Sequence, residues 1–262
     1  MKKMVGFDQK VQLHQLDYMA RELPRTDPKE LYEKMDDYLA RDIGGQKARR
    51  NTRTIIFKIW CHVPEAHQPI QQRAIQLFPS LPPAERLLLH WGLTILAYPF
   101  VKDFVQEMGY LFRMQDEVSS EQIGRRMKSL YGDRRRVEVA TGAVLMSLRS
   151  WGVIHAHKQH RHTIAKMIQI TSLELKQWLT EVLLRATQST AMTIEKIHDH
   201  PLFFPFEFTI SIDELKNDQF SITRQGGGMV MVGLKSRRKK QNASHQEQSS
   251  VNSTLFKVEQ SF

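Results

Sequence analysis

The sequence has very little cysteine. Cys61 is the one cysteine among 262 residues, so no disulfide can form within the chain, and a zinc site built from several cysteines is excluded. A protein without disulfides suits a reducing compartment. We therefore expect a cytoplasmic protein.

The sequence also lacks a long hydrophobic run. The best candidate, residues 87–101, lies between Arg86 and Lys102 and is interrupted by His90 and Pro99. It is shorter than the roughly 20 apolar residues that a membrane-spanning helix needs. The first residues contain no continuous apolar segment of the kind that marks a signal peptide. These features predict a soluble protein, with a buried helix over 87–101 and no membrane partner.

Motifs of common enzymes are missing as well. The sequence contains no GxSxG, no HExxH and no cysteine–histidine pair in a nucleophile context. The longest glycine run, residues 226–228, lacks the Gly-Lys-Ser/Thr ending of a phosphate loop and lies between two expected strands. We expect neither an enzymatic activity nor a cofactor.

Positive charge is what the sequence has in excess. It holds 38 Lys and Arg against 28 Asp and Glu, a formal net charge of +10. Such a balance favours an acidic partner, either nucleic acid or an anionic surface. The surplus is not confined to one tail. It gathers in short clusters at residues 47–53, 125–128, 134–136, 158–161 and 235–240.

Hydrophobic periodicity predicts a mainly helical fold with small β elements. Asp27 is expected to cap a helix that begins at Pro28, and Pro99 is expected to break the helix that begins near Ala84. Thr171 and Glu174 form a capping-box pattern at the start of a later helix. The other expected elements are helices from 46, over 64–78 and over 193–198, and strands over 206–210, 220–223 and 229–234.

We expect four segments along the chain. Residues 1–83 form a helical N-terminal region that resembles a helix-turn-helix, and residues 84–170 form a central winged helix-turn-helix domain. Residues 171–235 form an α/β extension. Residues 236–262 are polar and basic with almost no core residues, which predicts a disordered tail.

The winged-helix prediction rests on the order of elements between residues 100 and 170. A helix, a short helix, a turn, a long helix and a β-hairpin follow one another, which is the order of a winged helix. Ser119 or Ser120 can cap the short helix, and Asp133 can cap the long one. Gly152 ends the long helix, and alternating β-rich residues follow it.

The long helix has two different faces. Its apolar stripe consists of Val137, Ala140, Val144, Leu148 and Trp151. A stripe at this spacing packs on neighbouring elements, and Trp151 is expected to wedge the helix against the hairpin and the preceding helix. The opposite face is then free to enter a DNA major groove. That face is predicted to carry Arg135, Glu138, Gly142, Met146 and Arg149.

Basic residues lie where a winged helix meets DNA. Three arginines begin the long helix, where the helix dipole and free backbone N–H groups favour phosphate. Lys158 and Arg161 lie at the hairpin tip, next to the DNA backbone or minor groove. Glu138 and Met146 on the free face argue against strong sequence specificity. The predicted DNA-binding residues here are Arg134, Arg135, Arg136, Arg149, Lys158 and Arg161.

A second basic helix begins near Gln46, after a Gly-Gly turn. No wing follows it, so a solvated basic face is the alternative to a DNA contact. Arg50 and Arg53 are three residues apart and can share a face. The predicted DNA-binding residues of this helix are Lys47, Arg49, Arg50 and Arg53.

Four histidines in the hairpin raise the question of a metal site. His155, His157, His160 and His162 lie close together in the sequence, but no cysteine or clearly placed carboxylate accompanies them. Zinc requires a complete tetrahedral ligand set. We therefore expect polar hairpin residues and no bound metal.

Several segments together resemble the BrxA-type proteins of BREX phage-exclusion systems. The resemblance covers about residues 27–154 and lies in ARRNTRTIIFKIW, in ERLLLHWGLTILAYPFVKDFVQEMGYLFRMQ and in the stretch that ends at SWGVI. It implies a mostly helical fold with helix-turn-helix or winged-helix modules at both ends, and non-catalytic DNA binding within a bacterial defence locus. The segment 171–234 and the basic tail depart from this pattern.

The sequence thus predicts a DNA-binding accessory protein of a BREX-like antiviral defence system, which binds duplex DNA with little sequence specificity and possesses no enzymatic activity. Other proteins of a defence complex are possible partners. Two alternatives stay open. One is an assembly or adaptor subunit whose winged helix contacts another protein, since a fold does not fix a function. The other is a transcriptional regulator.

Overall fold

A computed structural model describes residues 3–235. The fold is mainly helical with small sheets of two or three strands, as predicted. Across residues 3–235, every helix is too short or too polar to span a bilayer. The predicted tail, residues 236–262, lies outside the described residues.

Four helices form the N-terminal part: α1 (Leu13–Glu22), α2 (Pro28–Ala40), α3 (Gln46–Trp60) and α4 (Gln68–Leu77). The start of α2 is as predicted, because Pro28 occupies its first position and the Asp27 carboxylate accepts the Lys29 N–H. The helix expected over 64–78 is divided. A 3-10 turn, Glu65–His67, precedes α4, and a second one, Phe78–Ser80, follows it.

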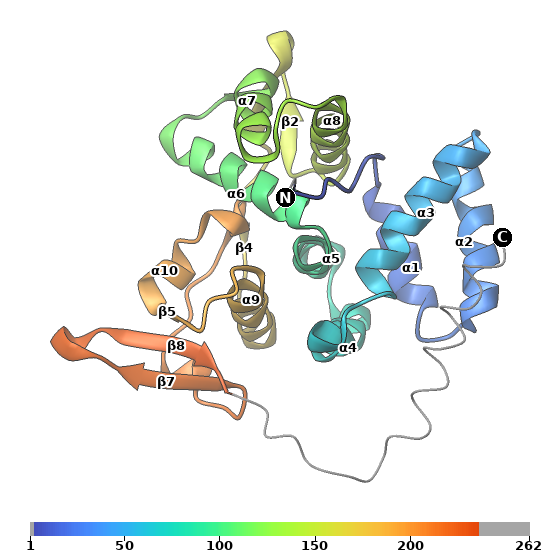
Figure 1. Ribbon diagram of the computed structural model, residues 1–262. Coiled ribbons are helices and arrows are strands. Elements are labelled where there is room, and N and C mark those ends of the chain that lie inside the picture. Colours follow the sequence, from blue (N-terminus) through green and yellow to red (C-terminus); the bar gives the residue numbers. More distant parts are fainter. Residues whose placement is uncertain (1–2, 236–262) are drawn as a thin grey trace.

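Two long helices follow, α5 (Pro83–Ala97) and α6 (Pro99–Met114). The break falls at Pro99, as expected for a residue without a backbone N–H. Helix α5 is buried along most of its length and lies at the centre of the molecule (Figure 1), where it packs against α1, α3, α6 and α9. Its apolar residues therefore form a core helix, as the sequence indicated, but the helix expected over 87–101 ends at Ala97, and residues 99–101 begin α6.

The next elements are β1 (Val118–Ser119), α7 (Ser120–Tyr131), α8 (Arg135–Ser150), β2 (Ile154–Ala156), a 3-10 turn (Lys158–His160) and β3 (Arg161–Ile164). The three strands form an antiparallel sheet in the order β1-β3-β2, with Val118 opposite His162 and Ile154 opposite Ile164. The β2–β3 hairpin projects beyond α7 and α8 (Figure 1). Strand β1 was not predicted, because two residues leave no periodic pattern.

The caps of this region confirm one prediction and contradict another. The Ser119 hydroxyl accepts the Gln122 N–H at 3.1 Å and the Gln122 side chain accepts the Ser119 N–H, which completes a capping box. Asp133 does not cap α8. Arg134 occupies the cap position without a side-chain hydrogen bond to the helix, and Asp133 instead pairs with Lys128 at 2.9 Å.

The C-terminal part contains β4 (Ile168–Gln169), α9 (Leu173–Ala186), β5 (Ala191–Thr193), α10 (Ile194–His198), β6 (Phe206–Glu207), β7 (Phe220–Arg224) and β8 (Val230–Leu234). Short 3-10 turns lie at Pro201–Phe203, Asp213–Leu215 and Gly226–Gly228. The strand expected over 206–210 is limited to β6, which pairs in parallel with β4. The prediction of a capping box at Thr171 is wrong, because the Ser172 hydroxyl caps α9 by accepting the Leu175 N–H.

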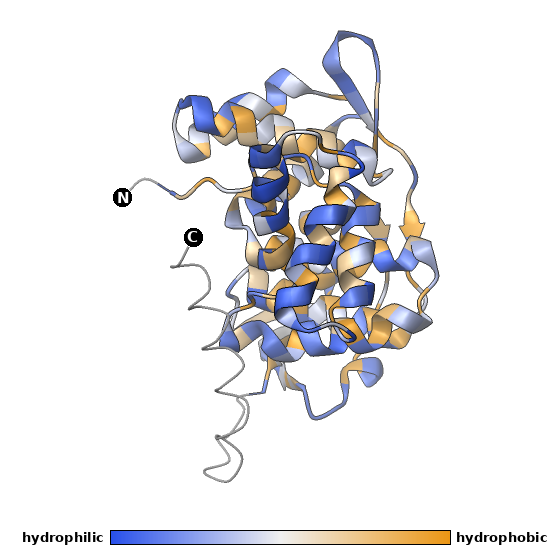
Figure 2. Ribbon diagram, turned by 90° about the vertical axis from the view of Figure 1, so that its right-hand side faces the viewer, coloured by the Kyte–Doolittle hydropathy of each residue, from blue (hydrophilic) through white to orange (hydrophobic). Residues whose placement is uncertain are grey.

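A single hydrophobic cluster connects the helices and strands. Buried tryptophans join distant segments: the indole N–H of Trp91 donates to the Leu202 carbonyl at 2.9 Å, and that of Trp178 donates to the Ile70 carbonyl at 3.0 Å. Hydrophilic and hydrophobic residues alternate along the helices (Figure 2), so each helix turns one face to this core. This core extends across the expected boundaries between the four segments. The division of the chain into these segments stays a prediction.

Candidate nucleic-acid interface

Helix α8 has one buried and one exposed face. Val137, Ala140, Val144 and Leu148 are at most 1% exposed, because they recur at helical spacing and pack on neighbouring elements. The opposite face carries the five residues named from the sequence: Arg135, Glu138, Met146 and Arg149 are exposed, and Gly142 is half-buried. The predicted orientation of α8 is therefore confirmed.

The three arginines at the start of α8 have different surroundings. Arg134 is half-buried, and its guanidinium donates to the Tyr131 carbonyl at 2.8 Å and to the Lys3 carbonyl at 3.1 Å. The Arg135 side chain is 85% exposed and pairs with Glu138 at 3.2 Å. Arg136 is exposed, with no ion pair or side-chain hydrogen bond to any residue from 3 to 235. Arg134 thus fastens the N-terminal segment, and Arg135 and Arg136 face solvent.

The hairpin tip presents two basic residues. Lys158 is exposed, and Arg161 pairs with Glu117 at 3.2 Å while its side chain stays 52% exposed. Gln159 and His160 adopt left-handed backbone conformations, with φ of 58° and 56°. The His157 N–H donates to the Arg161 carbonyl at 2.8 Å and closes the turn. The tip is therefore a tight turn with a cation on each side.

The hairpin histidines do not converge on a common point. His162 is 2% exposed, and its Nε2 lies 2.9 Å from the Ser120 hydroxyl at the start of α7. His157 Nε2 lies 2.9 Å from the Thr163 hydroxyl instead. Within residues 3–235, no group of three or more histidine, cysteine, aspartate or glutamate side chains is placed to hold a metal ion. His162 is thus a structural residue that joins the hairpin to α7.

Burial lowers the pKa of His162 from its usual 6.5 to about 4, and the Arg149 cation nearby adds to this effect. Between these two values the unfolded chain binds a proton that the folded protein does not. Stability that is present above pH 6.5 is therefore lost as the pH falls toward 4. We expect the melting temperature to fall between pH 7 and pH 5, and to fall less in His162→Gln. Thermal melts at both pH values test this, and equal decreases in the two proteins would contradict it.

The four basic residues predicted to bind DNA from α3 divide into two pairs. Lys47 and Arg50 are exposed. Arg53 turns toward α2 instead. Its guanidinium donates a hydrogen bond of 2.6 Å to the Asp36 carboxylate and lies 3.9 Å from the centre of the Tyr32 ring. Its side chain is 15% exposed, so the expectation that it shares a free face with Arg50 is wrong.

Arg49 is likewise occupied within the protein. Its guanidinium donates to the carbonyls of Ile43 and Gly44 at 3.1 and 3.0 Å, and its Nε lies 3.6 Å from Asp36. These bonds satisfy carbonyls in the loop that follows α2. Arg49, Arg53 and Arg134 are therefore structural residues, and the exposed cations in the first turns of α3 are Lys47 and Arg50.

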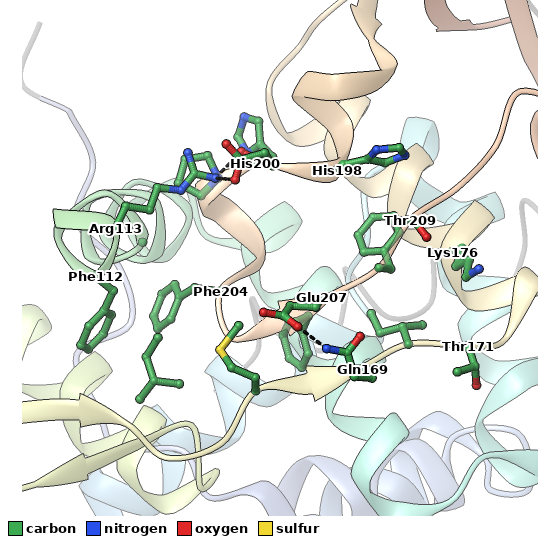
Figure 3. A pocket seen from close by; sticks show the side chains of 18 residues that line it. Phe112, Arg113, Gln169, Thr171, Lys176, His198, His200, Phe204, Glu207 and Thr209 are labelled. Atoms are coloured by element: carbon green, nitrogen blue, oxygen red, sulfur yellow. Dashed lines mark hydrogen bonds and ion pairs between the residues drawn. The ribbon is translucent and has the colours of Figure 1, made fainter. Parts of the chain in front are cut away.

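A separate pocket of about 850 Å³ lies between α6, β4, α10 and β6 (Figure 3). Phe112 and Phe204 line its apolar side. The charged groups at its edge are paired within the chain: Arg113 with Asp199 at 2.6 Å, and Glu207 with the Gln169 amide. An anion would have to displace Asp199 to reach Arg113, so this pocket is not included among the nucleic-acid contacts.

Sequence reasoning missed one part of the exposed face of α8. Val139 is 41% exposed, as is Met146. Val139 was not singled out, because a valine in a helix is usually a core residue. Val139 and Met146 are seven residues apart and therefore lie on the same side of the helix. The predicted exposure of Met146 thus also indicates that Val139 is exposed.

Comparisons with family models, with curated proteins and with solved structures found no match to this chain. The resemblance to BrxA-type proteins therefore stays a prediction.

Proposed function

We propose that this protein is a non-catalytic, duplex DNA-binding protein that uses a winged helix built from α6, β1, α7, α8, β2 and β3. The order of these elements and the strand order β1-β3-β2 support this assignment. Helix α8 enters the major groove, and the β2–β3 hairpin contacts the adjoining backbone. Lys47 and Arg50 of α3 supply a second basic contact.

The observation that carries the proposal is the exposed face of α8. Arg135 and Arg136 lie at its first turn, where the helix dipole also favours phosphate. Arg149 lies in its last turn, and Lys158 and Arg161 extend the basic surface onto the hairpin. Arg136, Arg149 and Lys158 have no ion pair anywhere in residues 3–235, so their charges are available to phosphates. Phosphate contacts carry no sequence information, which agrees with weak sequence preference.

In the cell, we propose the role that the resemblance implies, an accessory protein of a bacterial BREX-like phage-defence system that acts in the cytoplasm. The DNA-binding activity is tested independently of that role. Fluorescence anisotropy with a labelled random-sequence duplex is measured across salt concentrations. Each neutralised phosphate contributes about −0.9 to the slope of log K against log salt. The exposed cations of α8 and the hairpin, with Lys47 and Arg50 of α3, predict a slope between about −3 and −6. Absence of binding at low salt, or a slope near zero, would contradict the proposal.

A second candidate function is an assembly subunit that docks another protein on α8. The exposed apolar side chains of Val139 and Met146 favour it, because such residues also occur at protein interfaces. Salt separates the two candidates, since an apolar interface lacks the steep salt dependence of phosphate binding. A transcriptional regulator would instead bind one promoter sequence much more tightly than random duplex.

A further inference from the structure

The centre of the exposed face of α8 is apolar. Arg135, Val139, Gly142, Met146 and Arg149 follow one another at intervals of four and three residues and form one line along the helix, which we call the α8 stripe. Its two ends are arginines. Its middle consists of two exposed apolar side chains on either side of a glycine. The stripe thus combines charged ends with a centre that offers no hydrogen-bonding side chain.

Gly142 has no packing reason to be a glycine. A Cβ atom at this position would meet nothing within 4 Å, whereas one at Gly92 or Gly109 would collide with Trp178 or Pro201. Glycine inside a helix is less stable than alanine by about 0.5–1 kcal/mol. Residue 142 therefore lowers stability without any gain inside the protein. A group that approaches α8 closely from outside explains its presence.

The groove between α7 and α8 shows the same feature. Gly124 of α7 also has nothing within 4 Å of an added Cβ, and both glycines line this groove. Thr141 lines it too; this residue is 7% exposed, and its hydroxyl has no hydrogen-bond partner among the described residues. A buried hydroxyl without a protein partner is unusual. These observations place the close approach along the side of α8 that adjoins α7.

Building on the proposed DNA-binding function, we infer that the α8 stripe binds the C5-methyl groups of pyrimidines, above all thymine, in the major groove. The thymine methyl is the apolar group that base pairs present there. Val139 and Met146 contact such methyl groups, and Gly142 lets the helix backbone come close to the base edges. Arg135 and Arg149, at the two ends of the α8 stripe, contact phosphates of the DNA backbone.

The dimensions of the stripe agree with this arrangement. Val139 and Met146 are two helical turns apart, about 10 Å along the axis, which corresponds to roughly three base-pair steps. Glu138, the acidic residue beside the stripe, pairs with Lys128 at 2.8 Å and with Arg135 at 3.2 Å, so its charge is compensated. Methyl contacts without bidentate hydrogen bonds select base composition and not a fixed site. The inference therefore remains compatible with weak sequence specificity.

The test compares two duplexes of identical sequence, one with thymine and one with deoxyuridine, which lacks the C5-methyl group. Burial of one methyl group corresponds to about 0.8 kcal/mol, a factor of about four. We expect the thymine duplex to bind about four- to fifteen-fold more tightly, for one or two methyl groups. Replacing cytosine by 5-methylcytosine in the deoxyuridine duplex should restore part of the affinity.

Three variants connect this preference to the stripe. Val139→Ala and Met146→Ala should each lower the ratio of thymine-duplex to deoxyuridine-duplex affinity by up to about fourfold, the share of one methyl contact. Gly142→Ala should raise the melting temperature but weaken binding to the thymine duplex. Its raised melting temperature shows that it is folded, so a loss of affinity reflects the added methyl on the helix.

The outcomes separate the two proposals. Duplex binding with the expected salt slope but equal affinity for thymine and deoxyuridine would overturn the methyl contact and leave the proposed function standing. A thymine preference that stays undiminished in both Val139→Ala and Met146→Ala would also overturn it. Failure to bind either duplex at low salt would overturn the proposed function together with this inference.

Discussion

Trp151→Ala is expected to lower the melting temperature of the protein substantially. Trp151 is 5% exposed and follows directly after α8. Its indole N–H donates to the Val11 carbonyl at 2.9 Å, and its ring lies edge-on to Trp91 with centroids 6.5 Å apart. Truncation of a buried tryptophan lowers the free energy of unfolding by about 3–5 kcal/mol. A domain has only about 5–15 kcal/mol in total.

Trp151→Phe is the control for this prediction. Phenylalanine keeps most of the buried ring but removes the donor to Val11, so we expect a loss of about 1 kcal/mol. In thermal melts we expect the highest melting temperature for the unmodified protein, a lower one for Trp151→Phe and the lowest for Trp151→Ala. DNA binding measured well below both melting temperatures should be nearly unchanged in Trp151→Phe. A melt that does not shift in Trp151→Ala, together with lost binding, would make Trp151 a contact residue and contradict its place in the core.

The same tryptophan shows where sequence reasoning reaches its limit. Its burial follows from the apolar stripe of α8, but its partners do not. We predicted contacts with the hairpin and the preceding helix, whereas its hydrogen bond and its ring contact involve Val11 and Trp91. Val11 is 140 residues away in the chain. Helical periodicity specifies which face of a helix is buried, and tertiary packing decides what covers it.

Local signals predicted some helix boundaries correctly, although the caps expected at Asp133 and Thr171 are wrong. Asp27, Ser119 and Pro99 act within one helical turn of their own positions, through a cap hydrogen bond or a missing N–H. The sheets were predicted less well. The strands β4 and β6 pair in parallel with two residues each, and such short strands have neither an alternating pattern nor a connecting turn that could be recognised.

For the basic residues, too, the sequence predicted the position in a helix but not the contacts with distant segments. Sequence position placed all of Arg134, Arg135 and Arg136 at the start of a helix, and that placement is right to within one residue. It could not tell that Arg134 binds the carbonyl of Lys3, which is 131 residues away. Arg53 likewise depends on Asp36 of the neighbouring helix. Which cations remain free for DNA was therefore decided by contacts between distant segments.

Arg136→Ala combined with Arg149→Ala is expected to cause the largest loss of DNA affinity among the surface variants. Both side chains are exposed and have no ion pair within residues 3–235, so their removal leaves the core intact. If each neutralises one phosphate, the salt slope becomes less steep by about two. At about 0.1 M salt, each contact contributes nearly tenfold to affinity. We therefore expect a loss of between tenfold and one hundredfold, measured by fluorescence anisotropy across salt concentrations.

Two control proteins make this result specific to α8. Lys29→Ala with Lys196→Ala removes the same charge from exposed positions on α2 and α10, so it reports the effect of net charge alone and should change the slope little. Arg134→Ala should lower the melting temperature, because its guanidinium bonds to Tyr131 and Lys3 are lost, but it should keep the slope. If the control double variant weakens binding as much as Arg136→Ala with Arg149→Ala, the attraction is a general effect of the basic chain. Helix α8 would then not be the surface that meets DNA.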